Sequence, residues 1–267
     1  MKILHAGYSQ LRRLAAAAIA CAVLLPAAAG AENWKLSSSF NYDTGKYGTE
    51  YRTDSVYMPF TLKRYYSEGD LSVTVPYLSQ SSRGQVTWVG GKPVRSSDRN
   101  AAATASKASG LGDIMLRGTY NLKQDGPGSC ALALAGKLKL PSADEDKGLG
   151  TGEMDEGAGL EFAKEINSWT LLADGYYTII GDPAGVEYNN QVSLDLGFYA
   201  PLRENLGLTV MYETQSALVD GNADPRSLSG TLSYAVPEGM QISCGVALGM
   251  SDGSPALGLS AGLSQKF

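Results

Sequence analysis

The sequence predicts an all-β protein, a transmembrane antiparallel up-and-down β-barrel of about 12 strands. Apolar and polar residues alternate with a period of two along most of the chain after residue 31. The alternating segments have about the 9 to 11 residues that a tilted strand needs to cross a membrane. No segment of helical length repeats apolar residues at the spacing of a helix. Each strand would therefore turn one face to lipid and the other to a lumen.

Residues 1–31 are predicted to be a Sec-type signal peptide. Lys2, Arg12 and Arg13 precede the apolar run LAAAAIACAVLL, and small residues follow as far as Ala31. This run is shorter than the about 20 apolar residues of a membrane-spanning helix. We expect cleavage near Ala31, which leaves residues 32–267 as the barrel. A lipoprotein signal at Cys21 is the weaker alternative, because the leucine expected three residues earlier is missing.

Charge and composition exclude several classes of protein. Removing the signal takes away three positive charges and moves the formal net charge from -5 to -8, so the basic excess of a nucleic-acid-binding protein is missing. The single histidine is His5, so the mature chain lacks the usual general base of hydrolases and the commonest ligand of zinc. We therefore expect no enzyme, an outer-membrane lipid hydrolase included, and no cofactor, metal site or nucleic-acid partner. Cys130 and Cys244 fall on apolar faces and are interpreted as lipid-facing residues rather than a disulfide.

The first five predicted strands cover residues 34–43, 56–62, 71–79, 112–123 and 130–140. The fourth shows the pattern well, because Ile114 and Leu116 share one face while Asp113 and Arg117 share the other. About 13 Å of strand separates Asp113 from Arg117, so their partners must come from other strands.

The remaining seven predicted strands cover residues 154–164, 168–180, 189–202, 206–218, 227–236, 240–250 and 255–267. Several carry a charged residue near the middle of the polar face. Burying such charges in a dry core would be costly, whereas a water-filled lumen accepts them. The predicted lumen and selectivity residues are Asp113, Arg117, Lys137, Lys139, Glu161, Asp174, Tyr176, Asp195, Tyr199 and Glu213. They are equally consistent with a stiffening charge network and with a selectivity filter.

The connections sort by length as a barrel requires. If the chain begins in the periplasm, even-numbered strands should end in short turns, such as SEGD, REN and PEG, and odd-numbered strands in outer loops. The longest outer loop spans residues 80–108. Its basic residues are Arg83, Lys92, Arg95, Arg99 and Lys107. Three interpretations stay open: pairing with lipopolysaccharide phosphates, inward folding as a constriction over acidic lumen groups, or a mobile solvated loop.

The acidic stretch SADEDKGLGTGEMDE, residues 142–156, has the composition of a calcium loop. It breaks the EF-hand spacing, because Gly148 stands where an oxygen ligand belongs. We expect its glycines to permit a tight outer loop instead.

The chain ends on an aromatic residue, Phe267. This end resembles the C-terminal signature of outer-membrane barrels, which the barrel-assembly machinery reads, although Gln265 departs from it. The expected partners are this machinery through Phe267, outer-membrane lipid, lipopolysaccharide and a small-molecule solute.

Three stretches carry a more specific resemblance: GLGD at residues 110–113, KLKLPS at residues 137–142, and GLGTG at residues 148–152 with Asp155. In order and spacing they resemble the MetA-pathway of phenol degradation family of outer-membrane proteins, often labelled transporters. The resemblance implies a barrel of this size that carries hydrophobic or aromatic compounds across the outer membrane.

Two functions are therefore expected from the sequence. The first is a porin-like channel of the bacterial outer membrane that passes small solutes, hydrophobic or aromatic ones among them, by diffusion through a charged lumen. The alternative is a structural or surface-interaction barrel with a blocked lumen and ligand-binding outer loops.

Overall fold

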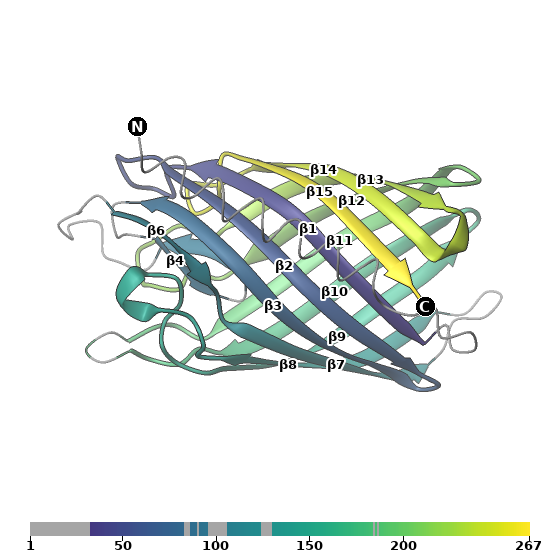
Figure 1. Ribbon diagram of the computed structural model, residues 1–267, viewed down its shortest axis with the longest axis horizontal. Coiled ribbons are helices and arrows are strands. Elements are labelled where there is room, and N and C mark those ends of the chain that lie inside the picture. Colours follow the sequence, from purple (N-terminus) through teal and green to yellow (C-terminus); the bar gives the residue numbers. More distant parts are fainter. Residues whose placement is uncertain are drawn as a thin grey trace.

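The protein is a closed antiparallel β-barrel (Figure 1). The computed structural model describes residues 33–82, 86–89, 91–95, 106–123, 130–183, 185 and 187–267. The predicted signal peptide lies outside these residues, and its cleavage stays a prediction. The wall consists of β1 (Trp34–Gly45), β2 (Thr53–Tyr66), β3 (Gly69–Ser82), β6 (Ser106–Leu111), β7 (Ile114–Lys123), β8 (Ala131–Leu140), β9 (Asp155–Ile166), β10 (Trp169–Ile179), β11 (Gln191–Arg203), β12 (Leu206–Gln215), β13 (Arg226–Val236), β14 (Met240–Gly249) and β15 (Leu257–Lys266).

Each strand pairs with its neighbours in chain order, and β1 pairs with both β2 and β15, which closes the ring. The strands β6 and β7 both pair with β3 and form one interrupted strand, so the barrel has 12 strands. The predicted fold class and strand number are confirmed.

The break between β6 and β7 falls at Gly112 and Asp113. The amide of Gly112 donates to the carbonyl of Pro76 at 2.9 Å, and a Cβ at residue 112 would lie 2.7 Å from Leu78 Cδ1. A side chain at residue 112 would therefore have to displace the side chains of Leu78 and Pro76 on β3. The sequence places the start of this strand at residue 112, whereas β6 extends it outward from Ser106.

The alternation of the sequence becomes the two faces of the wall. Large apolar side chains such as Leu71, Leu134, Leu194 and Leu259 are exposed on the outside, where a membrane barrel meets lipid. Charged and small polar residues alternate with them and face inward. Cys130 and Cys244 are both free.

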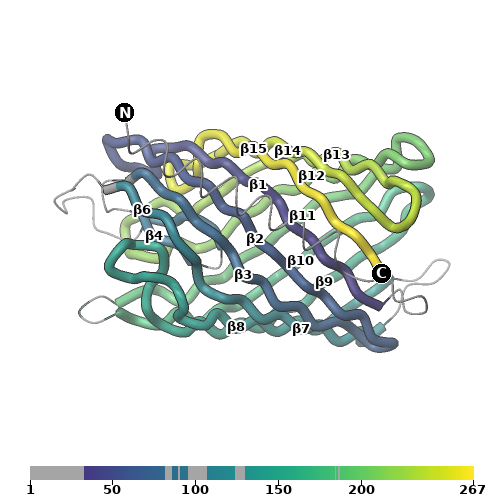
Figure 2. Tube along the Cα trace, viewed as in Figure 1, coloured from purple at the N-terminus to yellow at the C-terminus, as the bar shows by residue number. Residues whose placement is uncertain are grey.

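The two ends of the barrel differ. The C-terminus lies at the end opposite to β6 (Figure 2), and there Trp34 and Phe267 exchange two backbone hydrogen bonds of 3.0 Å. We call this the periplasmic end, because its connections are short, and the other the outer end. The helices in the described part of the chain, Glu145–Lys147 and Pro237–Gly239, are single 3₁₀ turns, and neither could span a membrane.

A two-stranded hairpin, β4 (Val86–Val89) with β5 (Lys92–Arg95), lies inside the barrel. All its described residues are buried apart from Gly91 and Lys92. The ring of Trp88 stacks on Tyr57 of β2, with ring centroids 5.5 Å apart. Val89 and Val94 pack with two further buried residues, Ile180 and Leu218. The described part of the long loop thus adopts the inward-folded arrangement.

Candidate functional site: the barrel lumen

Four carboxylates form a row across one side of the lumen. Glu161 of β9 is in register with Asp174 of β10, Asp174 with Asp195 of β11, and Asp195 with Glu213 of β12. Directly opposed residues of antiparallel strands have Cβ atoms about 4.5–5.5 Å apart, so like charges in this row repel. We call these four residues the acidic row. Cations at its two ends offset this repulsion.

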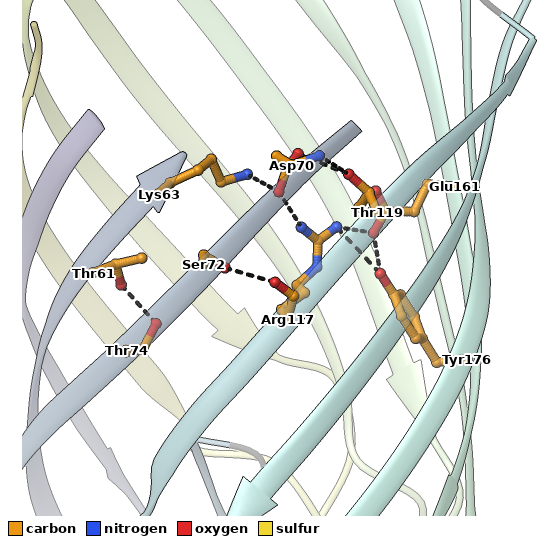
Figure 3. Close-up of polar contacts among 9 residues, drawn as sticks. All are labelled: Thr61, Lys63, Asp70, Ser72, Thr74, Arg117, Thr119, Glu161 and Tyr176. Carbon is orange, nitrogen blue, oxygen red and sulfur yellow. Dashed lines mark hydrogen bonds and ion pairs between the residues drawn. The ribbon is translucent and has the colours of Figure 1, made fainter. Parts of the chain in front are cut away.

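Arg117 neutralises the β9 end of the acidic row. Its guanidinium donates to Glu161, which also accepts a hydrogen bond from the hydroxyl of Tyr176 (Figure 3). Its other terminal nitrogen, Nη1, lies 3.7 Å from Asp70 Oδ1. The predicted lumen residues Arg117, Glu161 and Tyr176 therefore meet at one point.

Asp70 extends this network toward β2. Lys63 Nζ lies 3.1 Å from Asp70 Oδ1, and the hydroxyl of Thr119 donates to Asp70 Oδ2 at 2.8 Å (Figure 3). On the other side, Lys137 Nζ lies 4.8 Å from the centroid of the Tyr176 ring. These charges are partly exposed to lumen water, so each pair contributes about 0–1 kcal/mol to stability. The network links β2, β3, β7, β8, β9 and β10.

Lys92 of the hairpin neutralises the β12 end of the row. Its ammonium donates to Glu213 Oε2 at 2.6 Å, and Ser229 donates to Glu213 Oε1 at 3.3 Å. Desolvation within the lumen would by itself lower the pKa of Lys92, whose side chain still reaches lumen water, but the charge and hydrogen bond of Glu213, with the charges of Asp195 and Asp43, outweigh this effect and raise the pKa. Lys92 is therefore a fixed positive charge that ties the hairpin to the wall.

Asp113 and Lys139 face inward from the wall but are enclosed beneath the outer loop 141–154. Lys139 is 4% exposed, and its ammonium lies 2.8 Å from Asp155 Oδ2, 3.5 Å from Asp113 Oδ2 and 2.7 Å from the hydroxyl of Thr151. Asp113 Oδ1 accepts the backbone amides of Ser142 and Ala143 at 3.1 and 3.0 Å. We call Lys139, Asp113, Asp155 and Thr151 the buried cluster.

The other predicted residues lie apart from these groups. The ring of Tyr199 covers Gly207, where a Cβ would lie 2.3 Å from it. Arg95 is buried, and its Nη1 donates to the carbonyl of Gly48 at 2.6 Å. Lys107 is exposed on β6. Arg83 and Arg99 lie outside the described residues, and among those described no group of acidic, histidine or cysteine residues could hold a metal ion.

Sequence reasoning missed several lumen residues. Tyr57 falls on the polar face of the second predicted strand and Asp43 on that of the first, so strand alternation could have identified both. Asp70 was part of a predicted turn, and Trp88 lay in an irregular loop. Only the fold brings these two to the lumen.

Three cavities adjoin one another along the opposite side of the lumen. The outer cavity, of about 460 Å³, lies among the outer loops; the middle one, of about 420 Å³, lies beside the hairpin; and the inner one, of about 210 Å³, lies toward the periplasmic end. The outer and middle cavities share Pro225 and Gly253, and the middle and inner ones share Ser39 and Pro59.

Small residues make this space. Thr231, Gly245, Ser260 and Asn41 are in register across β13, β14, β15 and β1, and the rows below continue with serine and glycine. Glu213 and Lys92 border the middle cavity on its far side, and Asp43 of β1 borders it on the side of the small residues.

Solved structures with the same fold are outer-membrane proteins. The COG4313 outer membrane channel from Pseudomonas putida F1 is 14% identical, with a TM-score of 0.65 over 90% of this chain and 97% of that chain. The NanC porin is 10% identical, with a TM-score of 0.56 over 87% and 100%, and the KdgM porin is 8% identical, with 0.51 over 87% and 99%. At these identities the likeness shows the fold alone.

No curated protein matches the chain significantly. A family model described as "Putative MetA-pathway of phenol degradation" matches residues 65–267, which is most of the chain and includes all three stretches on which the sequence resemblance rests. The chain belongs to this family.

Proposed function

We propose that this protein is a channel of the bacterial outer membrane through which small polar solutes diffuse. The observation that carries the proposal is the series of three adjoining cavities, which leads from the outer loops past the hairpin toward the periplasmic end. Family membership and a fold found in outer-membrane channels support it. The proposal involves no covalent step.

The hydroxyl groups along the cavity walls favour polar over hydrocarbon solutes, although prolines and aliphatic residues share the wall of the middle cavity. Hydroxyl groups of Ser39, Ser260 and Thr231 line the middle cavity, and those of Ser243 and Ser264 line the inner one. A hydroxyl both donates and accepts hydrogen bonds, so such a wall can replace part of the water shell of a polar solute. The leucines of the same strands point outward. This lining narrows the expectation from sequence, which admitted hydrophobic and aromatic solutes.

The charged side of the lumen would set the selectivity. Glu213, at one end of the acidic row, borders the middle cavity together with Lys92 and Asp43. A polar solute would pass between the serine-lined wall, which carries Asp43, and the charges of Glu213 and Lys92. Fixed charges in a narrow lumen attract ions of opposite charge and exclude ions of like charge, as in the selectivity filters of channels.

A barrel with a blocked lumen is the second candidate, because the hairpin bridges the lumen from Tyr57 on β2 to Glu213 on β12. In this case the outer loops would carry the function, through lipopolysaccharide or another surface ligand. The two candidates differ in one measurable property, the conductance of the intact protein.

The experiment is to refold residues 32–267 in detergent and insert them into planar bilayers. We expect discrete conductance steps, and swelling of liposomes in small sugars and amino acids that falls as solute size increases. A barrel that stays closed, but opens when the hairpin is replaced, would favour the blocked-lumen candidate. A barrel closed in both forms would contradict the channel proposal.

Targeting and assembly are part of the proposal. The signal peptide would be removed near Ala31, and Phe267, which is paired with Trp34 at the periplasmic end, would be read by the assembly machinery. Removing Phe267 should leave the precursor processed but lower the amount of heat-modifiable barrel in outer-membrane fractions. Undiminished assembly would contradict this role.

A further inference from the structure

The three stretches that carry the family resemblance meet at one place in the fold. GLGD ends at Asp113 in the break between β6 and β7, KLKLPS supplies Lys139 and Ser142, and GLGTG supplies Leu149 and Thr151 beside Asp155. None of these described residues lines the three cavities of the proposed path. The buried cluster therefore does not touch a solute on that path, and its charges need another explanation.

The contacts of the buried cluster join the wall to two outer loops. The ammonium of Lys139 reaches Asp155, Asp113 and Thr151 at once. Asp113 clamps the start of loop 141–154 through two backbone amides, and Asp155 Oδ1 accepts the amide of Gly181 at 3.1 Å. A buried charge left without its partner is strongly destabilising, so these groups hold one another in place.

The loop held in this way packs against the hairpin. Leu149 is 1% exposed and forms a buried group with Leu78 and Trp88, which is 3% exposed, and Ala143 packs against the same group. The loop lies close enough that a Cβ at Gly150 would come within 2.7 Å of Asp113 Oδ2. Trp88 in turn stacks on Tyr57, which lines the middle cavity. A continuous set of contacts thus leads from Lys139 to the pore.

We infer that Lys139, paired with Asp113 and Asp155, is a positioning residue that holds loop 141–154 against Trp88 and so fixes the hairpin that narrows the pore. The inference about pore width rests on the proposed channel function. The docking of the hairpin can be tested without it.

The first test uses Trp88 as the only tryptophan. In a W34F/W169F background, quenching of Trp88 fluorescence by acrylamide measures how well the loop and hairpin shield the ring. Replacing Lys139 with glutamine should raise the quenching constant toward that of an exposed indole. Lys63→Gln is the matched control: it removes the same charge from a lumen ion pair with Asp70 that has no contact with the hairpin. It should leave the quenching constant unchanged.

A second variant covers the case in which Lys139→Gln fails to fold, judged by heat-modifiable migration in gels. Leu149→Ala leaves every ion pair of the buried cluster intact and removes the packing of this side chain against Trp88 and Leu78, so it too should expose the Trp88 ring. In bilayers, both variants should raise the single-channel conductance above that of the parent. Shielding that persists in Leu149→Ala and in any folded Lys139→Gln would overturn the inference.

The two proposals fail differently. A parent barrel that never conducts would contradict the channel function, while the quenching comparison would still decide whether Lys139 positions the hairpin. Exposure of Trp88 without any change in the conductance of an open barrel would show that the hairpin does not set the pore width and would also overturn the inference.

Discussion

At the scale of single residues, Lys92 is a positive charge that both pairs with the acidic row and lines the proposed path. It lies between Glu213, to which it donates at 2.6 Å, and the space of the middle cavity, with Asp43 on the wall beyond. A positive charge at this point offsets carboxylates on two sides of the path. Its removal should therefore change which ions enter.

Lys92→Gln should increase the preference for cations, because Glu213 and Asp43 lose their counter-charge. The measurement is the reversal potential across a bilayer under a gradient of KCl. Lys107→Gln, on the exposed part of β6, is the control and should have little effect, because an exposed charge at the rim is screened. An equal shift in both variants would show that Lys92 holds no special position.

The pH dependence of the Lys92–Glu213 ion pair follows from the raised pKa of Lys92, because the attraction of Glu213 outweighs the desolvation of the ammonium in the lumen. A group with a raised pKa stabilises the fold below its ordinary pKa, and this contribution is lost as the pH rises through the raised value. From about pH 7 to about pH 9, below the ordinary lysine range, the ion pair should therefore stay intact. Deprotonation of Lys92 should therefore not change the reversal potential of the parent over this range. A Lys92→Gln barrel measured in parallel should show the same pH dependence as the parent, because any change then comes from other groups.

At the scale of elements, the strand wall follows from the sequence because each strand separates lipid from water, and this separation imposes a period of two. Leu134 of β8 illustrates the outer face: it is 49% exposed and lies among other leucines of the wall. Leu134→Arg should cost up to about 2–4 kcal/mol of folding free energy, the range for arginine at the bilayer midplane, measured by denaturant titration in lipid vesicles. Ser243→Arg, whose side chain faces the lumen, should cost far less, and equal costs would contradict the assignment of the faces.

The hairpin could not be predicted in the same way. Val86, Trp88, Val89 and Val94 are enclosed on both faces, so their segment shows no alternation and resembles an irregular loop. The burial of Lys139 was hidden for a similar reason. The alternation of apolar and polar residues along the strand places Lys139 on the inner face. Its enclosure depends on loop 141–154, whose sequence does not alternate and so does not predict where the loop packs.

Replacing residues 86–95 with a short glycine-serine linker should raise the single-channel conductance several-fold, on the order of the change in open area. The wall should still form, because the ring of strand pairings does not include the hairpin. Heat-modifiable migration checks that the barrel is intact. An intact barrel with the parent conductance would show that the hairpin does not narrow the path.

At the scale of the whole molecule, the lumen has two unlike sides. Strands β7 to β12 fill their side with long charged and aromatic residues linked by ion pairs, whereas β13, β14, β15 and β1 contribute serine, glycine and threonine. Space remains beside the small residues, and the charges face it. Because most of the charges are on one side, their electric field is directed across the path, between the charged side and the small residues.

The balance of these charges gives the last prediction. Around the middle of the lumen, Asp43 and the four carboxylates of the acidic row outnumber Lys92, Arg117 and Lys137. The parent barrel should therefore prefer cations, and the preference should weaken in concentrated salt, because the screening length falls from about 10 Å at 0.1 M to about 3 Å at 1 M. Reversal potentials at low and high KCl test this, and Asp195→Asn with Glu213→Gln should reduce the preference. An anion preference would contradict this prediction and would show that the lysines near the periplasmic end control ion selectivity. Lys35 lines the inner cavity and is in register with both Lys63 and Lys266. Replacing these three lysines should then restore the entry of cations.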